Sequence, residues 1–329
     1  MRVLVTGATG FTGSHLARAL LAAGREVRVL VRGEAKYDCP ATGVVQVMRG
    51  DLRSAKEVEA AVAGVDVVYH VAALYRAAKH ADQLYWDVNV GGTQHVLDAA
   101  RRQGVQRVVH CSTIGVHGAV AEVPANEEAP FDPGDIYQVT KLAGEQLAQA
   151  AFAKDIPGVV VRPAGIYGPG DMRFHKLFLL VRQGRFVMFG SGQVNLHMVY
   201  VDDLVTGMMQ CAESPRALGR TYILGGPEYA TLNELVRLVA QAVGAQRSRP
   251  LLRLPLSPLM AAATLCEWCC RPLGVEPPLH RRRAAFFTKN RGFTIERARA
   301  EIGYEPQVPL AVGLRRTAAW YRSQNLLPA

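Results

Sequence analysis

Tyr137 and Lys141 stand four residues apart in a stretch that has the apolar periodicity of a helix. Residues four apart in a helix share one face, so the two side chains lie next to each other. A free tyrosine, with a pKa of about 10, is a poor acid–base catalyst at neutral pH, but a nearby ammonium favours the phenolate and lowers that pKa. The pair therefore predicts that Tyr137 exchanges a proton with a carbonyl or an alcohol.

A hydroxyl that could hold the substrate oxygen beside Tyr137 comes from an earlier stretch. The apolar run 107–112 ends in Ser112, and Thr113 follows it at the carboxyl end of a predicted strand. We expect Thr113 to bind the substrate oxygen, with Ser112 as the alternative; either hydroxyl could instead cap the strand end. The predicted catalytic residues are thus Thr113, Tyr137 and Lys141.

Glycine spacing near the start of the chain predicts a dinucleotide site. The apolar run 3–6 leads into the glycine-rich loop 7–13, and a helical pattern follows. In such a strand–turn–helix unit Gly7 permits the tight turn, Gly10 lets the backbone approach a pyrophosphate, and Gly13 lets the helix pack closely on the strand. Free N–H groups at the helix start face the phosphates. The predicted cofactor-binding residues here are Gly7, Thr9, Gly10, Phe11, Thr12 and Gly13.

The residue at the end of the second predicted strand bears on the choice between NAD and NADP. A carboxylate at this place accepts the ribose 2′-hydroxyl of NAD. The run 26–31 is instead followed by Arg32, and the next carboxylate is Glu34. A guanidinium suits a 2′-phosphate. Arg32 therefore favours NADP as the cofactor, with NAD as the alternative.

These residues are positioned by a regular alternation of strands and helices through the first half of the chain. Strands are predicted at residues 3–6, 26–31, 44–48, 67–70, 107–112 and 158–162. Helices are predicted between them at residues 14–23, 55–63, 83–103 and 136–153. Such alternation indicates the α/β class, with a doubly wound parallel sheet of the Rossmann type and helices on both faces.

The pattern changes after about residue 170. Helices are predicted at 174–181, 202–213, 232–243, 295–302 and 310–325, and short strands at 186–189, 198–201 and 222–224. We expect residues 1–170 to form a dinucleotide-binding Rossmann domain that also receives residues 196–225. We expect residues 171–195 and 226–329 to form a smaller, mostly helical substrate-binding part that closes over it.

Composition limits the class of protein. The chain has 329 residues, of which 49% are hydrophobic and 20% charged, as is typical of a globular protein with a large core. The net charge of +10 comes mostly from scattered arginines, and nucleic-acid binding, which needs a basic stripe or patch, is not expected. The six cysteines lack the ligand spacing of a zinc site, so no metal is expected. The absence of a recognisable signal peptide or membrane span favours a cytoplasmic location.

Together these residues resemble the extended short-chain dehydrogenase/reductase family, within the NAD-dependent epimerase/dehydratase superfamily. The resemblance covers nearly the whole chain. The segments that carry it are Gly7-x-x-Gly10-x-x-Gly13, Asp51-Leu52, His70-Val71-Ala72-Ala73, Asn89-Val90-x-Gly92-Thr93, Ser112-Thr113, Tyr137-x-x-x-Lys141, Arg162-Pro163-x-x-Ile166-Tyr167-Gly168-Pro169 and Val201-Asp202-Asp203-Leu204.

The resemblance implies further cofactor contacts. The residues concerned would line the adenine (Asp51 and Leu52), run along the cofactor (Val71, Ala72 and Ala73) or flank the nicotinamide (Pro163 and Ile166). Tyr137 and Lys141 would also contact the cofactor, with Lys141 on the nicotinamide ribose. Asn89 would be mainly structural, and a homodimer is expected by analogy.

Two departures separate the chain from sugar-nucleotide epimerases. Those epimerases usually place an arginine, which grips the substrate diphosphate, a few residues before the Val201 element, and the stretch 195–200 has none. They also tend to carry Asn where this chain has Arg162. Without these groups a dianionic diphosphate is poorly matched. Segment 160–171 and the ending 293–321 instead resemble the 3β-hydroxysteroid and sterol-4-carboxylate 3-dehydrogenase branch, while dihydroflavonol reductases and hopanoid-associated relatives stay open.

An unusually apolar segment, residues 255–270, precedes Arg271 and a run of three arginines at 281–283. The segment is too short to span a bilayer, and apolar residues with tryptophan beside cations describe a helix that lies in a membrane interface. We therefore expect peripheral membrane contact, with a lipid-facing lid through which an apolar substrate enters. The alternative is an ordinary core helix or a dimer contact, because short apolar runs are ambiguous.

Three functions fit the sequence. The first is an oxidoreductase that moves a hydride between NAD(P) and a hydroxyl or ketone of a small apolar, steroid-, sterol- or terpenoid-like substrate, with Tyr137 as the general acid–base. The second is a sugar-nucleotide epimerase or dehydratase with tightly bound NAD. The third is a non-catalytic, cofactor-sensing protein on the same fold, against which the intact Thr113, Tyr137 and Lys141 argue.

Overall fold

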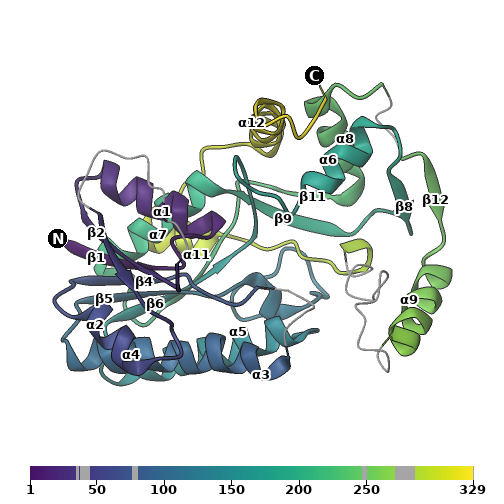
Figure 1. Cartoon of the computed structure of the whole chain (residues 1–329). Helices are drawn as coiled ribbons and strands as arrows, with labels where there is room; N and C mark the ends of the chain where they lie inside the picture. The colour runs from purple at the N-terminus through teal and green to yellow at the C-terminus, as the bar shows by residue number, and fades with distance from the viewer. Residues whose placement is uncertain (35–36, 38–44, 76–80, 247–249, 271–285, 329) are drawn as a thin grey trace.

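The computed structural model describes residues 1–34, 37, 45–75, 81–246, 250–270 and 286–328. Arg271, the arginines at 281–283 and the first residue of the predicted strand 44–48 lie outside these ranges. A large sheet with its helices forms one half of the molecule, and a smaller group of helices and short strands forms the other half (Figure 1).

Seven parallel strands form the central sheet in the order β10-β6-β5-β4-β1-β2-β3. Their bounds are β1 Arg2–Thr6, β2 Glu26–Val31, β3 Val45–Arg49, β4 Val67–His70, β5 Arg107–Cys111, β6 Gly158–Pro163 and β10 Thr221–Leu224. Val3, Leu4 and Val5 are fully buried, as expected of a parallel strand with helices on both sides. From β1 the chain first adds β2 and β3 on one side and then β4, β5, β6 and β10 on the other side. The order of the strands thus reverses between β1 and β4, and doubly wound sheets bind ligands at such a switch point.

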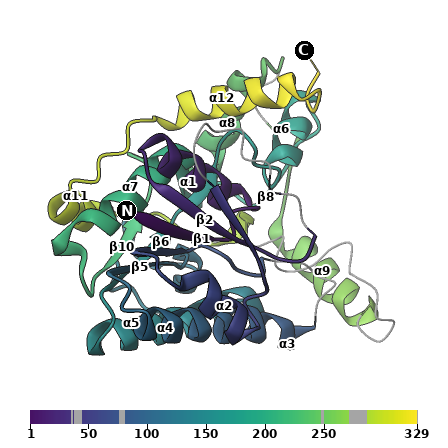
Figure 2. The same cartoon turned by 60° about the vertical axis from the view of Figure 1, so that its left-hand side comes forward.

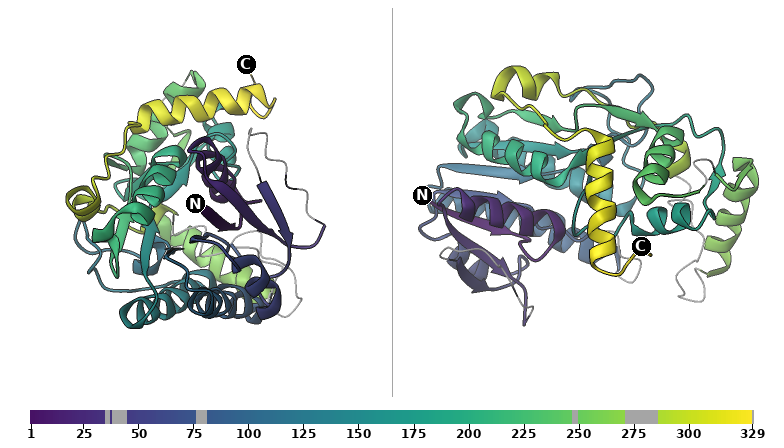
Figure 3. Two further views of the ribbon diagram at one scale, coloured as in Figure 1. Left: turned by 90° about the vertical axis from the view of Figure 1, so that its left-hand side faces the viewer. Right: turned by 90° about the horizontal axis from the view of Figure 1, so that it is seen from above.

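Helices cover both faces of this sheet (Figure 3). One face carries α1 Phe11–Ala22 and α7 Val201–Glu213; the other carries α2 Ala55–Val62, α4 Gly92–Arg102 and α5 Ile136–Lys154. The short helix α11 Glu296–Ile302 packs beside β10 at the edge of the sheet. The Rossmann architecture predicted from the strand–helix alternation is confirmed.

Arg28 is a charged residue inside the otherwise apolar strand β2, and it is buried. Its guanidinium Nη1 donates hydrogen bonds of 2.7 Å to the carbonyl oxygens of Ala61 and Ala63, at the end of α2. Its Nε donates to the side chain of Gln46 on β3. Because each of these donors has a partner, the strand tolerates a charge where both faces are covered.

The predicted helix 83–103 is present, but it is not one regular α-helix. The short helix α3 Asp82–Tyr85 continues through a π-helical segment, Trp86–Gly91, into α4. Asn89 in this segment accepts a 2.7 Å hydrogen bond from the backbone N of Leu74 and donates one of 3.0 Å to the hydroxyl of Thr140 on α5. Asn89 thereby ties the segment after β4 to α5, which is a structural role.

The smaller half contains two short sheets, of whose strands the sequence predicts β8 and the later part of β9. One consists of β7 Gly165–Tyr167, β9 Asn195–Tyr200 and β11 Tyr229–Thr231, and the other of β8 Val187–Phe189 and β12 Leu252–Leu254. The helices of this half are α6 His175–Arg182, α8 Leu232–Val243, α9 Leu256–Cys270 and α12 Leu310–Ser323, with α9 at the outer end beyond β12 (Figures 1 and 2). This half is therefore less purely helical than expected: β7, β11 and β12 were not predicted, because strands of three residues are too short to show a clear alternating pattern.

Candidate active site

A cleft of about 1190 Å³ opens at the carboxyl ends of the central strands, across the switch point between β1 and β4. Every residue predicted for catalysis or cofactor contact lines it: Gly7, Thr9, Gly10, Phe11, Thr12, Gly13, Arg32, Asp51, Leu52, Val71, Ala72, Ala73, Thr113, Tyr137, Lys141, Pro163 and Ile166. The fold thus gathers residues from positions 7 to 166 around one space.

The glycine loop before α1 is shaped for close backbone approach. Gly7 has a φ of +76°, and a Cβ there would lie 2.7 Å from the Cα of Ala72. A Cβ on Gly13 would overlap the carbonyl oxygen of Gly7, so α1 packs this closely on β1 only with glycine. The N-cap residue Gly10 offers no side chain to the first N–H groups of α1, and the first turn has no acidic residue. These N–H groups can therefore bind phosphate, and the loop fits a dinucleotide cofactor.

Charged residues follow the ends of β2 and β3 at the opposite end of the cleft from Tyr137. Asp51 forms an ion pair of 2.8 Å with Arg53. Hydrogen bonds from Arg53, together with the charges of Arg53 and Arg32, hold the pKa of the Asp51 carboxyl below its usual value. Arg32 lines the cleft and makes no ion pair within the described ranges. The cleft therefore has a guanidinium where NAD-specific sites have a carboxylate.

Helix α5 carries Tyr137 and Lys141 one turn apart, as predicted. Its N-cap, Asp135, accepts a 2.9 Å hydrogen bond from the backbone N of Gln138, which fixes the start of the helix. Lys141 is buried, and its Nζ donates a 2.6 Å hydrogen bond to the carbonyl oxygen of Cys111 at the end of β5. The Tyr137 ring packs edge-on against Tyr75, with 5.0 Å between the ring centroids. Helix α5 and β5 together set the place of the pair.

Two buried histidines lie beside Lys141. His70 on β4 and His110 on β5 have ring centroids 5.5 Å apart. Burial, aided by the charge of Lys141, lowers the pKa of His70 to about 3 and lowers the pKa of His110 well below its usual value. Burial also lowers the pKa of Lys141, whereas a negative charge on Cys111, in its thiolate form, or on Glu145 opposes this shift. The histidines are neutral at neutral pH and add no positive charge to the site.

The hydroxyls of Ser112 and Thr113 differ in their hydrogen-bond partners. Ser112 donates its proton to the buried carboxylate of Glu145. Thr113 is the N-cap of a short 3₁₀ helix, Ile114–His117, and its Oγ1 accepts a 3.0 Å hydrogen bond from the backbone N of Gly115. A hydroxyl has one proton to donate. That of Ser112 is committed to Glu145, whereas that of Thr113 is available to the cleft, so the geometry favours Thr113 as the donor to a substrate oxygen.

Arg173 also lines the cleft, although the sequence did not predict it as a site residue. It follows β7, and its Nε donates a 2.6 Å hydrogen bond to Asp171. Its guanidinium carbon lies 5.3 Å from the ring centroid of Phe11 and 5.9 Å from that of Tyr75. Arg173 therefore bridges the glycine loop and the ring beside Tyr137. No local pattern reveals this contact, because the three partners come from distant parts of the chain.

The end of the cleft beyond Tyr137 is built by later segments. Its lining there includes the apolar side chains of Leu196, Met198, Met260 and Phe286 and the cations Lys289 and Arg291. Arg291 runs alongside β9: its backbone N donates to the carbonyl of Asn195 at 2.7 Å, and its Nε donates to that of Gly118 at 3.1 Å. The stretch 195–200 lacks an arginine of its own, but the fold places one beside it.

Comparison with known proteins identifies the family. The sequence profile of the "NAD dependent epimerase/dehydratase family" matches residues 3–225. A 2-alkyl-3-oxoalkanoate reductase of Stenotrophomonas maltophilia is 35% identical to the chain, over 97% of the chain and 99% of the relative. A 3-beta-hydroxysteroid dehydrogenase of Mycolicibacterium neoaurum is 32% identical, over 93% of the chain and 87% of the relative.

Solved structures agree with this assignment. The crystal structure of gox2253 matches with a TM-score of 0.84 and 31% identity, over 99% of both chains. MoeE5, in complex with UDP-glucuronic acid and NAD, matches with a TM-score of 0.77 and 27% identity, over 98% of this chain and 100% of its own. The chain therefore belongs to the NAD dependent epimerase/dehydratase family, and it is an NAD(P)-dependent oxidoreductase of the extended short-chain dehydrogenase/reductase type.

Proposed function

We propose that this protein interconverts a ketone and the matching alcohol on a small apolar substrate of steroid, sterol or terpenoid type, with NADP as its preferred cofactor. One observation carries the proposal: Thr113, Tyr137 and Lys141 line the same cleft as the glycine loop, next to an apolar wall. This arrangement holds the reacting oxygen, the proton donor and the cofactor site together.

Each of the three catalytic residues has a separate role in the proposed reaction. The bound nicotinamide supplies or accepts the hydride. Thr113 donates a hydrogen bond to the substrate oxygen, and Tyr137 gives its phenolic proton to that oxygen in reduction and takes it back in oxidation. Lys141, held by the carbonyl of Cys111, stabilises the phenolate that remains and contacts the nicotinamide ribose.

The rest of the cofactor-binding set has roles along the cleft. The first N–H groups of α1 and the loop side chains Thr9, Phe11 and Thr12 take the pyrophosphate. Asp51 and Leu52 line the adenine, residues 71–73 run along the cofactor, and Pro163 and Ile166 flank the nicotinamide. Arg32 takes the 2′-phosphate, since it makes no ion pair within the described ranges.

The substrate class is supported by the wall of the cleft and by the relatives. Leu196, Met198, Met260 and Phe286 offer apolar contacts beyond Tyr137. Relatives with at least 30% identity include proteins named sterol demethylase protein B, from Methylococcus capsulatus, and a farnesyl-bearing dihydroquinoline-oxide ketoreductase, from Stigmatella aurantiaca. These names, with the hydroxysteroid dehydrogenase, refer to sterol, steroid and farnesyl-bearing compounds, which are largely apolar.

Peripheral contact with a membrane is part of the proposal, and it rests on α9 and β12. Trp268 and Leu265 on α9 are 74% and 61% exposed, and Leu252 on β12 is 51% exposed. Met260, on the same helix, lines the cleft, so α9 connects this apolar surface to the substrate end. No helix within the described part of the chain is long and apolar enough to cross a bilayer. Contact would therefore be interfacial; the homodimer stays a prediction by analogy.

A sugar-nucleotide epimerase is the second candidate, and Lys289 and Arg291 favour it. Both cations line the cleft near the substrate end, where a diphosphate would need positive charge. The Nε of Arg291 is occupied by the carbonyl of Gly118, which makes it a weaker match for a ligand. Tightly retained NAD together with conversion of uridine-diphosphate sugars would favour this candidate over the first.

Turnover of 3-ketosteroids and of 2-alkyl-3-oxo acids with NADPH tests the proposal. Tyr137→Phe should lower the rate by roughly two to four decades, because it removes the general acid–base. Binding of NADPH, followed by its fluorescence, should stay nearly unchanged. A Tyr137→Phe protein with normal turnover would refute the assigned mechanism.

A further inference from the structure

A fully buried carboxylate stands one turn beyond the catalytic pair. Glu145 follows Lys141 by four residues on α5, so Tyr137, Lys141 and Glu145 share one face of the helix. We infer that Glu145 and its partner Arg162 are positioning residues, which hold Ser112 and keep an anion beside Lys141 during turnover. The inference rests on the proposed function, because it takes Tyr137 and Lys141 as the catalytic pair.

Glu145 is held by donors from three elements. Ser112, after β5, donates its hydroxyl proton to Oε2. Arg162 on β6 donates from Nε to both oxygens, at 3.0 and 3.2 Å, and from Nη2 to Oε1 at 2.5 Å. Gln149, one turn further along α5, donates to Oε1 at 3.2 Å. The carboxylate is therefore fully hydrogen-bonded and fixed in both position and orientation.

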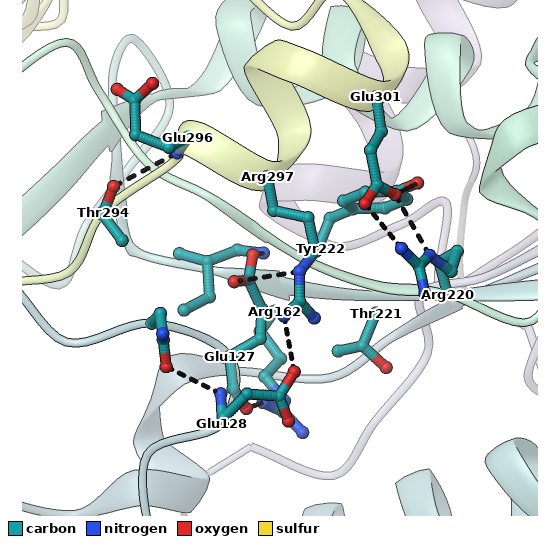
Figure 4. Close-up of polar contacts among 12 residues, drawn as sticks. Glu127, Glu128, Arg162, Arg220, Thr221, Tyr222, Thr294, Glu296, Arg297 and Glu301 are labelled. Atoms are coloured by element: carbon teal, nitrogen blue, oxygen red, sulfur yellow. Dashed lines mark hydrogen bonds and ion pairs between the residues drawn. The ribbon is translucent and has the colours of Figure 1, made fainter.

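The other side of Arg162 is fixed as well. Its Nη1 lies 3.0 Å from Nε2 of the buried His117 and donates a 2.7 Å hydrogen bond to the carbonyl oxygen of Glu127. Glu127 in turn accepts a 2.9 Å hydrogen bond from the backbone N of Ile223 on β10, and Arg297 stands beside it (Figure 4). Burial and the charge of Arg162 lower the pKa of His117, so this ring is a neutral partner. The guanidinium of Arg162 is therefore held by partners on both sides, with Glu145 on one and His117 and the carbonyl of Glu127 on the other.

This placement changes the meaning of Arg162. Because sugar-nucleotide epimerases tend to carry Asn at this position, we expected Arg162 to affect the binding of a substrate diphosphate. Arg162 does not line the substrate cleft in the described structure. It lines a second cavity, of about 480 Å³, with Glu127 and Arg297. Arg162 therefore acts on α5 and Ser112, and not on the substrate directly.

Stability alone is a poor reason for this pair. Removing two charges from water is expensive, and well-packed apolar residues often replace a buried ion pair without loss of stability. A carboxylate beside a buried ammonium has a second effect, which is to oppose the loss of the ammonium proton. Glu145 has this effect on Lys141, whose pKa burial lowers.

The remaining groups that face Lys141 cannot replace Glu145. His70 on β4 and His110 on β5 are neutral, and burial raises the pKa of the Cys111 thiol, which stays protonated at neutral pH. Tyr137, on the same helix, carries charge only after it has given up its proton. Glu145 is thus the permanent anion acting on Lys141 among the described groups that shift its pKa.

The test is the pH dependence of kcat/KM for ketone reduction by NADPH. This direction requires protonated Tyr137 and Lys141, so activity falls on an alkaline limb. Glu145→Gln removes an anion that favours the ammonium form of Lys141 and should move this limb to lower pH by about one unit. Glu145→Asp keeps the charge but withdraws it by one methylene, so it should move the limb in the same direction by a smaller amount.

Arg28→Gln is the matched control. It removes another buried, hydrogen-bonded guanidinium from the sheet, away from the cleft, and should lower the melting temperature while leaving the limb in place. If Glu145→Gln does not fold, Glu145→Asp carries the test. A limb that coincides with that of the wild type in the folded Glu145 variants overturns the inference. Tyr137→Phe separates the two claims, because normal turnover in that variant overturns the proposed function itself.

Discussion

Thr113→Val removes one hydroxyl from the site and keeps the branched shape of the side chain. In the structure this hydroxyl accepts a hydrogen bond from the backbone N of Gly115, and its proton is available to the cleft. Losing the first contact removes a cap, which costs about 1 kcal/mol of unfolding free energy. Losing the second removes a donor to the developing oxyanion, which costs about 2.7–4 kcal/mol, or roughly 100- to 1000-fold in rate.

Ser112→Ala is the control at the neighbouring residue, and we expect it to lower stability more than activity. Its hydroxyl donates to the buried Glu145, so its loss should cost about 1.5–3 kcal/mol of stability, as for a hydrogen bond to a charged group. Its proton does not reach the substrate, so kcat/KM should fall far less than in Thr113→Val. Thr113→Ser keeps the hydroxyl and should restore most of the activity.

The assay measures initial rates of ketone reduction at saturating NADPH, and urea unfolding gives the stability of the same preparations. We expect Thr113→Val to lose activity with a small loss of stability, and Ser112→Ala to lose stability with a small loss of activity. A Ser112→Ala protein that is stable but less active than Thr113→Val would refute the assignment of the two protons.

Two further predictions concern the ends of the cleft. Arg32→Asp should move the ratio of kcat/KM for NADPH over NADH toward NADH by roughly 10- to 100-fold, the equivalent of one charged hydrogen bond; an unaltered ratio in steady-state kinetics would show that any 2′-phosphate is held elsewhere. The double variant Leu265→Ser/Trp268→Ser should lower the liposome-bound fraction in flotation at least roughly tenfold, since it removes two exposed apolar side chains. Trp86→Ser, at a tryptophan that is 39% exposed on another element, is its control, and equal flotation of all three proteins would contradict a lipid-facing α9.

The sequence predicts the central sheet well because its signals are local. Buried parallel strands appear as short apolar runs, and the helix 232–243 is predicted with the bounds of α8, because Thr231 caps its start and Gly244, in the left-handed region, ends it. The glycine loop and the Tyr137–Lys141 spacing are likewise contained in a few consecutive residues. Their prediction needs no knowledge of long-range packing.

The parts that could not be predicted depend on contacts between distant residues. Arg173 reaches Phe11, Arg291 lies along β9, and Arg162 meets Glu145 across the interface between β6 and α5. None of these pairs has a fixed spacing in the sequence. The choice of Thr113 over Ser112 also depends on a contact between distant residues, because the hydroxyl proton of Ser112 is donated to Glu145.

The two ends of the cleft come from different stretches of the chain. The cofactor end uses residues 7–73, whereas the far wall uses Leu196, Met198, Met260 and residues 286–291. Substitutions at well-separated positions act nearly independently. Mutations in the later stretch could therefore change the substrate specificity of this protein during evolution while its cofactor-binding residues stay unchanged. Recombination of that stretch among relatives offers the same route to new specificities in the laboratory.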